Sequence, residues 1–96
     1  MTIFARFHAR EGLVEALATA VRDVVPPTRA EAGCLSIDAY RSIQDSALFF
    51  INSHWVDEAA FERHARLPHT IDFLGAVASL VDQPAQIART KPLDDV

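Results

Sequence analysis

Hydrophobic and polar residues alternate along three short stretches of the chain, which is the pattern of half-buried β-strands. These stretches are residues 3–9, 34–41 and 48–55. Between the first two, apolar residues recur every three or four positions from Leu13 to Val25, which predicts an amphipathic helix. Pro26 and Pro27 should end or kink this helix, because neither prolyl nitrogen can donate a helical hydrogen bond.

The second half of the chain predicts two further helices and a last strand. Asp57 is a suitable N-cap for a helix over residues 58–64, and Pro68 suits the first turn of the next helix. That next helix is expected to bury one apolar stripe, formed by Ile71, Leu74, Val77, Ala78 and Val81. A short strand follows over residues 85–90, and residues 92–96 are predicted to form a frayed tail.

The predicted order β-α-β-β-α-β indicates an α+β fold with a ferredoxin-like antiparallel sheet and helices on one face. Strand alternation assigns to the helix-covered face Ile3, Ala5, Phe7, Leu35, Ile37, Phe49, Ile51 and Trp55. The opposite face carries Phe4, Arg6, His8, Asp38, Tyr40, Phe50, Asn52 and His54. This second face is too aromatic for open solvent and too polar for a dry core. It favours a homodimer, in which a second copy's sheet covers it, over a monomer with one hydrated sheet face.

Composition narrows the possible roles of the chain. Its 96 residues fit one domain, and 50% of them are hydrophobic. The formal net charge is −4 and no run of Lys or Arg forms a basic patch, which argues against nucleic-acid or membrane-surface binding. No apolar stretch approaches the roughly 20 residues of a membrane helix, and no signal peptide is evident. The single cysteine, Cys34, cannot form an internal disulfide, which fits a cytoplasmic protein.

Three stretches carry a family resemblance. They are residues 27–35 (PTRAEAGCL), 55–61 (WVDEAAF) and 64–69 (HARLPH). In this order they resemble the antibiotic-biosynthesis monooxygenase-like proteins, over nearly the whole chain from Ile3 to Thr90. The resemblance implies one such domain over residues 1–96 and a dimeric α/β barrel, in which two sheets face each other. The superfamily includes cofactor-free oxygenases, haem-degrading enzymes and an isomerase-like branch.

Individual positions separate the branches of that superfamily. The haem-degrading branch uses an Asn on the first strand, and a Trp and a haem-ligating His in the second helical region. The corresponding positions here are Phe7, His64 and Leu74, so the Asn and the haem ligand are missing and haem degradation is disfavoured. The polyketide oxygenase branch resembles this chain at Trp55, but its nearby Asn and Tyr are replaced by Ile51 and Phe61.

The leading hypothesis is a cofactor-free monooxygenase that uses dioxygen on a hydroxylated aromatic or quinol. An apolar slot between helices and sheet would bind the flat substrate, and the residues expected to form it are Phe7, Ile37, Ile51, Trp55 and Phe61. A neutral histidine would take the substrate's hydroxyl proton, with His64 as the first candidate and His69 as the second. Each has a structural alternative: core packing for Trp55 and His64, and helix capping or surface exposure for His69.

No metal site or cofactor is expected. The four histidines fall on different elements, and no pair has the spacing of a metal-binding helix. His8 and His54 are interpreted as polar residues of the dimer interface, and Cys34 as an unreactive thiol. No Gly-rich loop follows a strand, so nucleotide-binding motifs are missing. A non-catalytic binding module, or an isomerase or lyase using the same histidine, stays open as an alternative, and oxygen consumption would discriminate the monooxygenase from both.

Overall fold

The computed structural model describes residues 1–94. Seven elements follow one another: β1 (Thr2–His8), α1 (Val14–Arg29), β2 (Cys34–Arg41), β3 (Leu48–Trp55), α2 (Glu58–His64), α3 (Pro68–Leu80) and β4 (Gln86–Thr90). This arrangement confirms the predicted α+β, ferredoxin-like fold, with α2 and α3 together in the place of the second helix. The predicted tail extends to residues 95–96, which lie outside the described residues.

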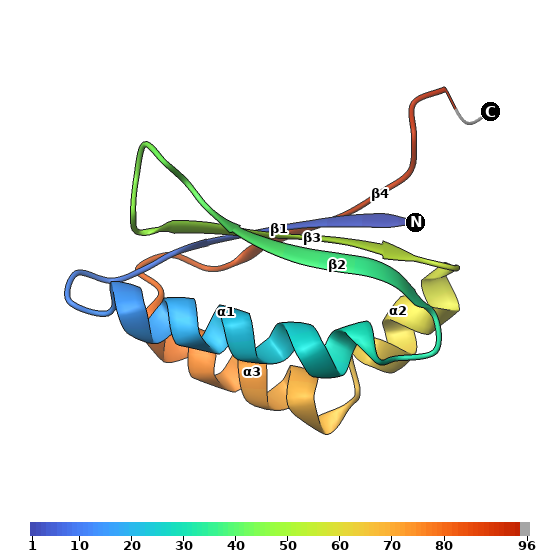
Figure 1. Ribbon diagram of the computed structural model, residues 1–96, viewed down its shortest axis with the longest axis horizontal. Helices are drawn as coiled ribbons and strands as arrows, with labels where there is room; N and C mark the ends of the chain where they lie inside the picture. Colours follow the sequence, from blue (N-terminus) through green and yellow to red (C-terminus); the bar gives the residue numbers. More distant parts are fainter. Residues whose placement is uncertain (95–96) are drawn as a thin grey trace.

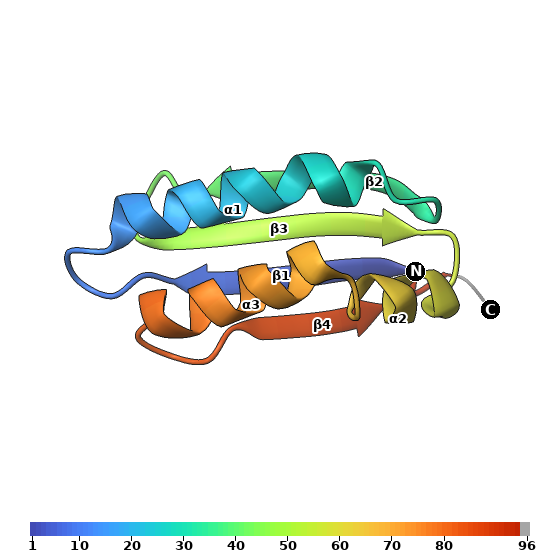
Figure 2. The ribbon, with the colours of Figure 1, turned by 90° about the horizontal axis from the view of Figure 1, so that it is seen from below.

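All strand pairs in the sheet are antiparallel, and the spatial order is β2-β3-β1-β4. The helices lie together on one side of this sheet, so its other side is bare in a single chain (Figure 1). The long helices α1 and α3 contact each other, with α1 along β2 and β3, and α3 along β1 and β4 (Figure 2). The sheet and the two helices therefore form two layers, with the core between them.

The core contains most of the residues assigned to the helix-covered face. Phe7, Ile37 and Trp55 are among the buried members. Leu35 was wrongly assigned to this face, because it is 69% exposed. The pairing register of β2 with β3 shifts between Cys34 and Ser36, so the alternation inferred from the sequence is broken at Leu35. The partly buried Cys34 packs against the core at this end of β2 instead.

The prolines were predicted to end or kink the first helix, and they do not end it, because α1 continues through Pro26 and Pro27 to Arg29. Both prolines lie on the exposed side of the helix, as do the residues four positions earlier, whose carbonyls lose their helical partners. Water can hydrate those carbonyls, while Val24, Val25 and Thr28 hold the opposite side in the core. Burial on one side therefore outweighs the two missing hydrogen bonds on the other.

The face that helix α3 presents to the core matches the predicted one only in part. Val77 is buried, as is Val81, the residue directly after the helix, but Ile71 and Leu74 are 55% and 40% exposed. Phe73 instead packs edge-on against Phe7, with ring centroids 5.7 Å apart. The true contact stripe thus shares Val77 and Val81 with the predicted one and is rotated from it by less than one residue, so that Phe73 takes the place of Leu74.

Candidate active site

A cavity of about 350 Å³ lies between the sheet and the three helices. Four of the five residues predicted to form an apolar slot line it, namely Phe7, Ile37, Ile51 and Phe61. His64 also lines the cavity, so the structure places the first candidate base beside the predicted walls. Its remaining walls are mostly apolar, including Leu74 and Ile87 at the exposed side. Such a space suits a small, largely apolar ligand with few polar groups.

Trp55 lies behind this cavity and is not one of the residues that line it. Its side chain is only 1% exposed, and its indole N–H donates to Ser53 Oγ at 2.9 Å. The indole packs against the rings of His64 and Phe61, with centroid distances of 4.8 and 5.6 Å. Trp55 therefore packs against two residues that line the cavity, His64 and Phe61.

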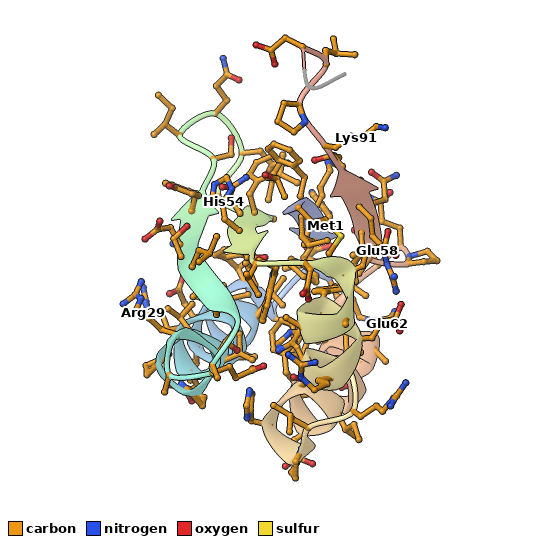
Figure 3. All side chains as sticks on the ribbon, turned by 90° about the vertical axis from the view of Figure 1, so that its right-hand side faces the viewer. Met1, Arg29, His54, Glu58, Glu62 and Lys91 are labelled. Carbon is orange, nitrogen blue, oxygen red and sulfur yellow. The ribbon has the colours of Figure 1, made fainter. Side chains whose placement is uncertain are left out.

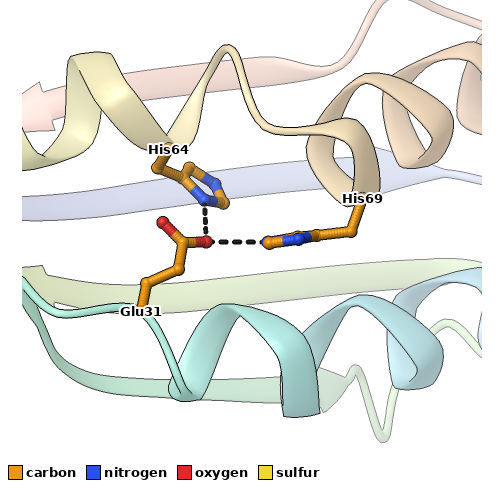
Figure 4. Close-up of side chains that lie close together, drawn as sticks. All are labelled: Glu31, His64 and His69. Carbon is orange, nitrogen blue, oxygen red and sulfur yellow. Dashed lines mark hydrogen bonds and ion pairs between the residues drawn. The ribbon is translucent and has the colours of Figure 1, made fainter.

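His64 and His69 are joined by a third side chain, Glu31 (Figure 4). A single carboxylate oxygen, Glu31 Oε2, lies 2.7 Å from His64 Nδ1 and 2.7 Å from His69 Nε2. The Thr70 hydroxyl lies 3.2 Å from the same His64 nitrogen. The side chains of Glu31, His64 and His69 are 12%, 13% and 26% exposed, so the cluster is mostly shielded but still reachable from solvent.

The carboxylate determines which nitrogen of each imidazole carries the proton. An ionised carboxylate only accepts hydrogen bonds, so Nδ1–H of His64 and Nε2–H of His69 donate to Glu31. A neutral His64 then has its lone pair on Nε2, which makes no hydrogen bond to any of residues 1–94. In that tautomer, Nε2 of this cavity-lining histidine is the nitrogen that can accept a proton. His69 borders a separate hollow between α1 and α3.

Local sequence signals position these three side chains. Asp57 caps α2, since its carboxylate accepts the Ala60 N–H at 2.8 Å, and the helix then ends at His64. Pro68 begins α3, which puts His69 in its first turn. Gly33 lets the segment after α1 lie against α2, because a side-chain carbon at this position would collide with Ala60. Glu31, two residues earlier, is thereby brought beneath the end of α2.

An ion pair closes one rim of the cavity. Arg89, on β4, lines the cavity, pairs with Glu62 of α2 and lies over the Phe61 ring at 5.1 Å. Glu62 lies on the outer side of α2 (Figure 3). The hydrogen bond from Arg89 lowers the pKa of the Glu62 carboxyl. The rim therefore has one positive and one negative group that neutralise each other.

The other two histidines lie away from the cavity. His8 bonds Asp82 through Nδ1 at 2.9 Å and Asp45 through Nε2 at 3.0 Å, and these bonds raise its pKa. His54 lies on the sheet side opposite the helices (Figure 3) and contacts Thr2 Oγ1 at 2.9 Å. Both positions agree with the assignment of these residues to the second sheet face.

The thiol of Cys34 lies close to the cluster. Burial, and then the negative charge of Glu31, raise its pKa. A raised pKa disfavours the nucleophilic thiolate, in agreement with the expectation of an unreactive cysteine.

Sequence comparison assigns the family. The sequence profile of the antibiotic biosynthesis monooxygenase family matches residues 1–76, a span that includes Glu31, His64 and His69. The chain belongs to this family.

Solved structures of relatives have the same fold. PA3566 from Pseudomonas aeruginosa is 37% identical and superposes with a TM-score of 0.89, covering 96% of this chain and 92% of that one. Rv0793 from Mycobacterium tuberculosis is 30% identical over 95 residues, covering 99% of this chain and 93% of that protein. Its structure superposes with a TM-score of 0.91. A crystal structure described as an antibiotic biosynthesis monooxygenase has a TM-score of 0.90 at 20% identity, which shows the fold alone.

Across residues 1–94, no helix is both long enough and apolar enough to cross a membrane.

Proposed function

We propose that this member of the family is a cofactor-independent monooxygenase that acts on a hydroxylated aromatic or quinol bound in the 350 Å³ cavity. The observation that carries the proposal is the pair formed by Glu31 and His64, a cavity-lining histidine whose Nε2 has no hydrogen-bond partner among residues 1–94. Family membership supports oxygen chemistry, and the cavity supports a small, flat, mostly apolar substrate.

His64 is the general base of the proposed reaction. Nε2 takes the proton of the substrate hydroxyl, and the negative charge of Glu31 stabilises the imidazolium that forms. Glu31 acts through His64 and is a positioning residue. His69 donates to the same carboxylate oxygen and restricts its position.

The ionised substrate supplies the electrons for reduction of dioxygen. For a quinol, one oxygen atom enters the ring and the other leaves as water, so quinol plus dioxygen gives a hydroxyquinone and water. The four electrons come from oxidation of the quinol to the quinone level and of one ring C–H bond to C–OH. Apolar walls such as Phe7, Ile51 and Phe61 exclude bulk water from the reduced-oxygen intermediate.

We further propose that the protein is a homodimer in which the bare sheet faces cover each other. Phe4, Tyr40 and Phe50 are 55%, 55% and 37% exposed on that face in the single chain. Among residues 1–94, the helices all lie on the other side of the sheet (Figure 1). Aromatic residues interspersed with polar ones are typical of the core of a protein–protein interface.

Oxygen uptake with a panel of quinols and phenols tests the enzymatic proposal. His64→Gln keeps an amide that can donate to Glu31 but has no basic nitrogen, so turnover should fall by about 10²–10⁴-fold. The defect should shrink as pH rises toward the substrate's own pKa, since solvent then ionises the hydroxyl. His54→Gln, a histidine outside the cavity, is the matched control and should keep wild-type turnover.

Glu31→Gln separates positioning from packing. It should lower kcat by about 10-fold or more at nearly unchanged KM, and Glu31→Asp should recover part of the loss. Equal turnover per folded molecule in wild type and His64→Gln would show that His64 is not the base. Substrate proton exchange without oxygen uptake would instead support an isomerase, and binding without either reaction would support a binding module.

A further inference from the structure

The cluster of Glu31, His64 and His69 has the composition of a metal-binding site. One atom from each side chain, Glu31 Oε2, His64 Nδ1 and His69 Nε2, lies within 4.8 Å of both others (Figure 4). We infer that these three atoms bind one divalent transition-metal ion of the zinc class, and that the ion switches off the base at the cavity. The inhibition rests on the proposed function, whereas the binding does not.

The ligand types favour this class of ion. Imidazole nitrogen with carboxylate oxygen is a common donor set for zinc and its neighbours in the first transition series. With metal–ligand bonds of about 2.0–2.2 Å, tetrahedral geometry sets ligand atoms about 3.4 Å apart. Two of the present separations are 2.7 Å and all are within 4.8 Å. Side-chain shifts of about 1 Å would therefore convert the hydrogen-bonded cluster into a coordination shell.

The coordination shell would be incomplete, which sets the expected affinity. Three protein ligands leave a fourth position of zinc for water or a ligand oxygen, as in open rather than closed zinc sites. His64 Nε2 has no acceptor among residues 1–94 that would orient a metal-bound ring. We therefore expect micromolar binding that exchanges with free ion rather than a permanently held structural metal.

Metal binding changes the tautomer of His64. In the hydrogen-bonded cluster Nδ1 carries the proton and Nε2 has the lone pair. A metal on Nδ1 uses the lone pair of that nitrogen, so the proton moves to Nε2. The His69 proton moves from Nε2 to Nδ1 in the same way, and no proton is released overall. With Nε2 protonated and Nδ1 coordinated, His64 can no longer take a proton from the substrate.

His8 supplies a matched control within the same chain. It also contacts two carboxylates, but Asp82 bonds Nδ1 and Asp45 bonds Nε2, on opposite sides of the ring. Two nitrogens of one imidazole cannot bind the same ion, so this group offers no convergent site. The comparison separates a specific cluster from the general affinity of histidine and carboxylate side chains for zinc.

Calorimetric titration of chelator-treated full-length protein with zinc chloride at about pH 7 tests the binding. We expect one ion per chain with Kd of about 1–10 µM, and at least a tenfold weaker Kd in Glu31→Gln and in His69→Ala. His8→Ala should bind within about twofold of wild type. With cobalt chloride, visible absorption of a four- or five-coordinate ion should appear in wild type and be lost in Glu31→Gln. Wild-type binding weaker than about 1 mM, or equal binding by His69→Ala, would overturn the site.

Oxygen uptake in the presence of zinc tests the switch. Turnover should fall over the same zinc range as the binding curve, recover on addition of chelator, and be at least tenfold less zinc-sensitive in His69→Ala. Zinc binding with unchanged turnover would refute the switch and leave the site intact. Zinc binding by a protein that turns over no quinol or phenol would refute the proposed enzyme and leave the site intact. Zinc-independent turnover without binding would refute the metal inference alone.

Discussion

Thr28 is a buried polar side chain whose hydroxyl has no hydrogen-bond partner among the described residues. It is 0% exposed and lies on the inner side of α1, where the helix faces the cavity. Valine has nearly the same shape and the same branching at Cβ, so Thr28→Val replaces the unpaired hydroxyl by a methyl group. The two residues also have similar helix propensities, so the substitution isolates the effect of the hydroxyl.

The expected stabilisation follows from desolvation. An unpaired buried hydroxyl costs about 1–3 kcal/mol relative to its hydrated state, and we take the lower end because the adjacent cavity permits some relaxation. Thr28→Val should therefore raise the free energy of unfolding by about 1 kcal/mol. For a domain of this size such a gain corresponds to about 4–8 °C in Tm.

Urea unfolding at one fixed protein concentration measures this change, provided that the variants share the same dependence on urea. Thr19→Val, on the exposed side of the same helix, should shift stability by less than about 0.5 kcal/mol. Thr70→Val should lose less than about 1 kcal/mol, because the Thr70 hydroxyl lies 3.2 Å from His64 Nδ1, whose proton already goes to Glu31. If Thr28→Val is destabilised by 1 kcal/mol or more, the hydroxyl has a partner in the folded protein and the reasoning fails.

The sheet face away from the helices gives two further expectations. The pKa of His8 is raised by its bonds to Asp82 and then Asp45, so these pairs stabilise the fold fully below about pH 6.5 and progressively less as pH rises through the raised pKa. In thermal melts, His8→Ala should thus be further below wild type at about pH 6 than at about pH 9, and equal gaps would contradict this. Light scattering at micromolar concentration should give twice the chain mass of 10.6 kDa for wild type and a lower mass for a Phe4→Glu, Phe50→Glu double variant. A wild-type mass near 10.6 kDa would rule out the dimer.

Elements set by local signals were predicted well from the sequence. Asp57 and Pro68 each act within one helical turn, and the structure begins α2 and α3 where they indicated. Errors arose where distant contacts decide the outcome. The exposure of Leu35 depends on how β2 pairs with β3, and the continuation of α1 past Pro26 depends on what buries the opposite side of the helix. Neither fact can be obtained from periodicity alone.

The site was predicted only in part, because the sequence indicated the two histidines but not Glu31. His64 and His69 are five positions apart, which on one continuous helix would separate them by about 140°. Pro68 starts a new helix between them, and the imidazole centroids lie 6.0 Å apart in the structure. Glu31 lies in a turn more than 30 residues earlier in the chain, and an acidic side chain in a turn is usually solvated. Its contact with His64 depends on the packing of that turn against α2, which the sequence alone does not show.

Because one carboxylate oxygen accepts from both rings, the three side chains form a single unit with Glu31 at its centre. Replacing Glu31 disturbs both imidazoles, whereas replacing His69 leaves the pair of Glu31 and His64 in place. The base and the proposed metal site therefore both depend on Glu31, but they depend on His69 to different extents. A variant at His69 separates proton transfer from metal binding in a way that no variant at Glu31 can.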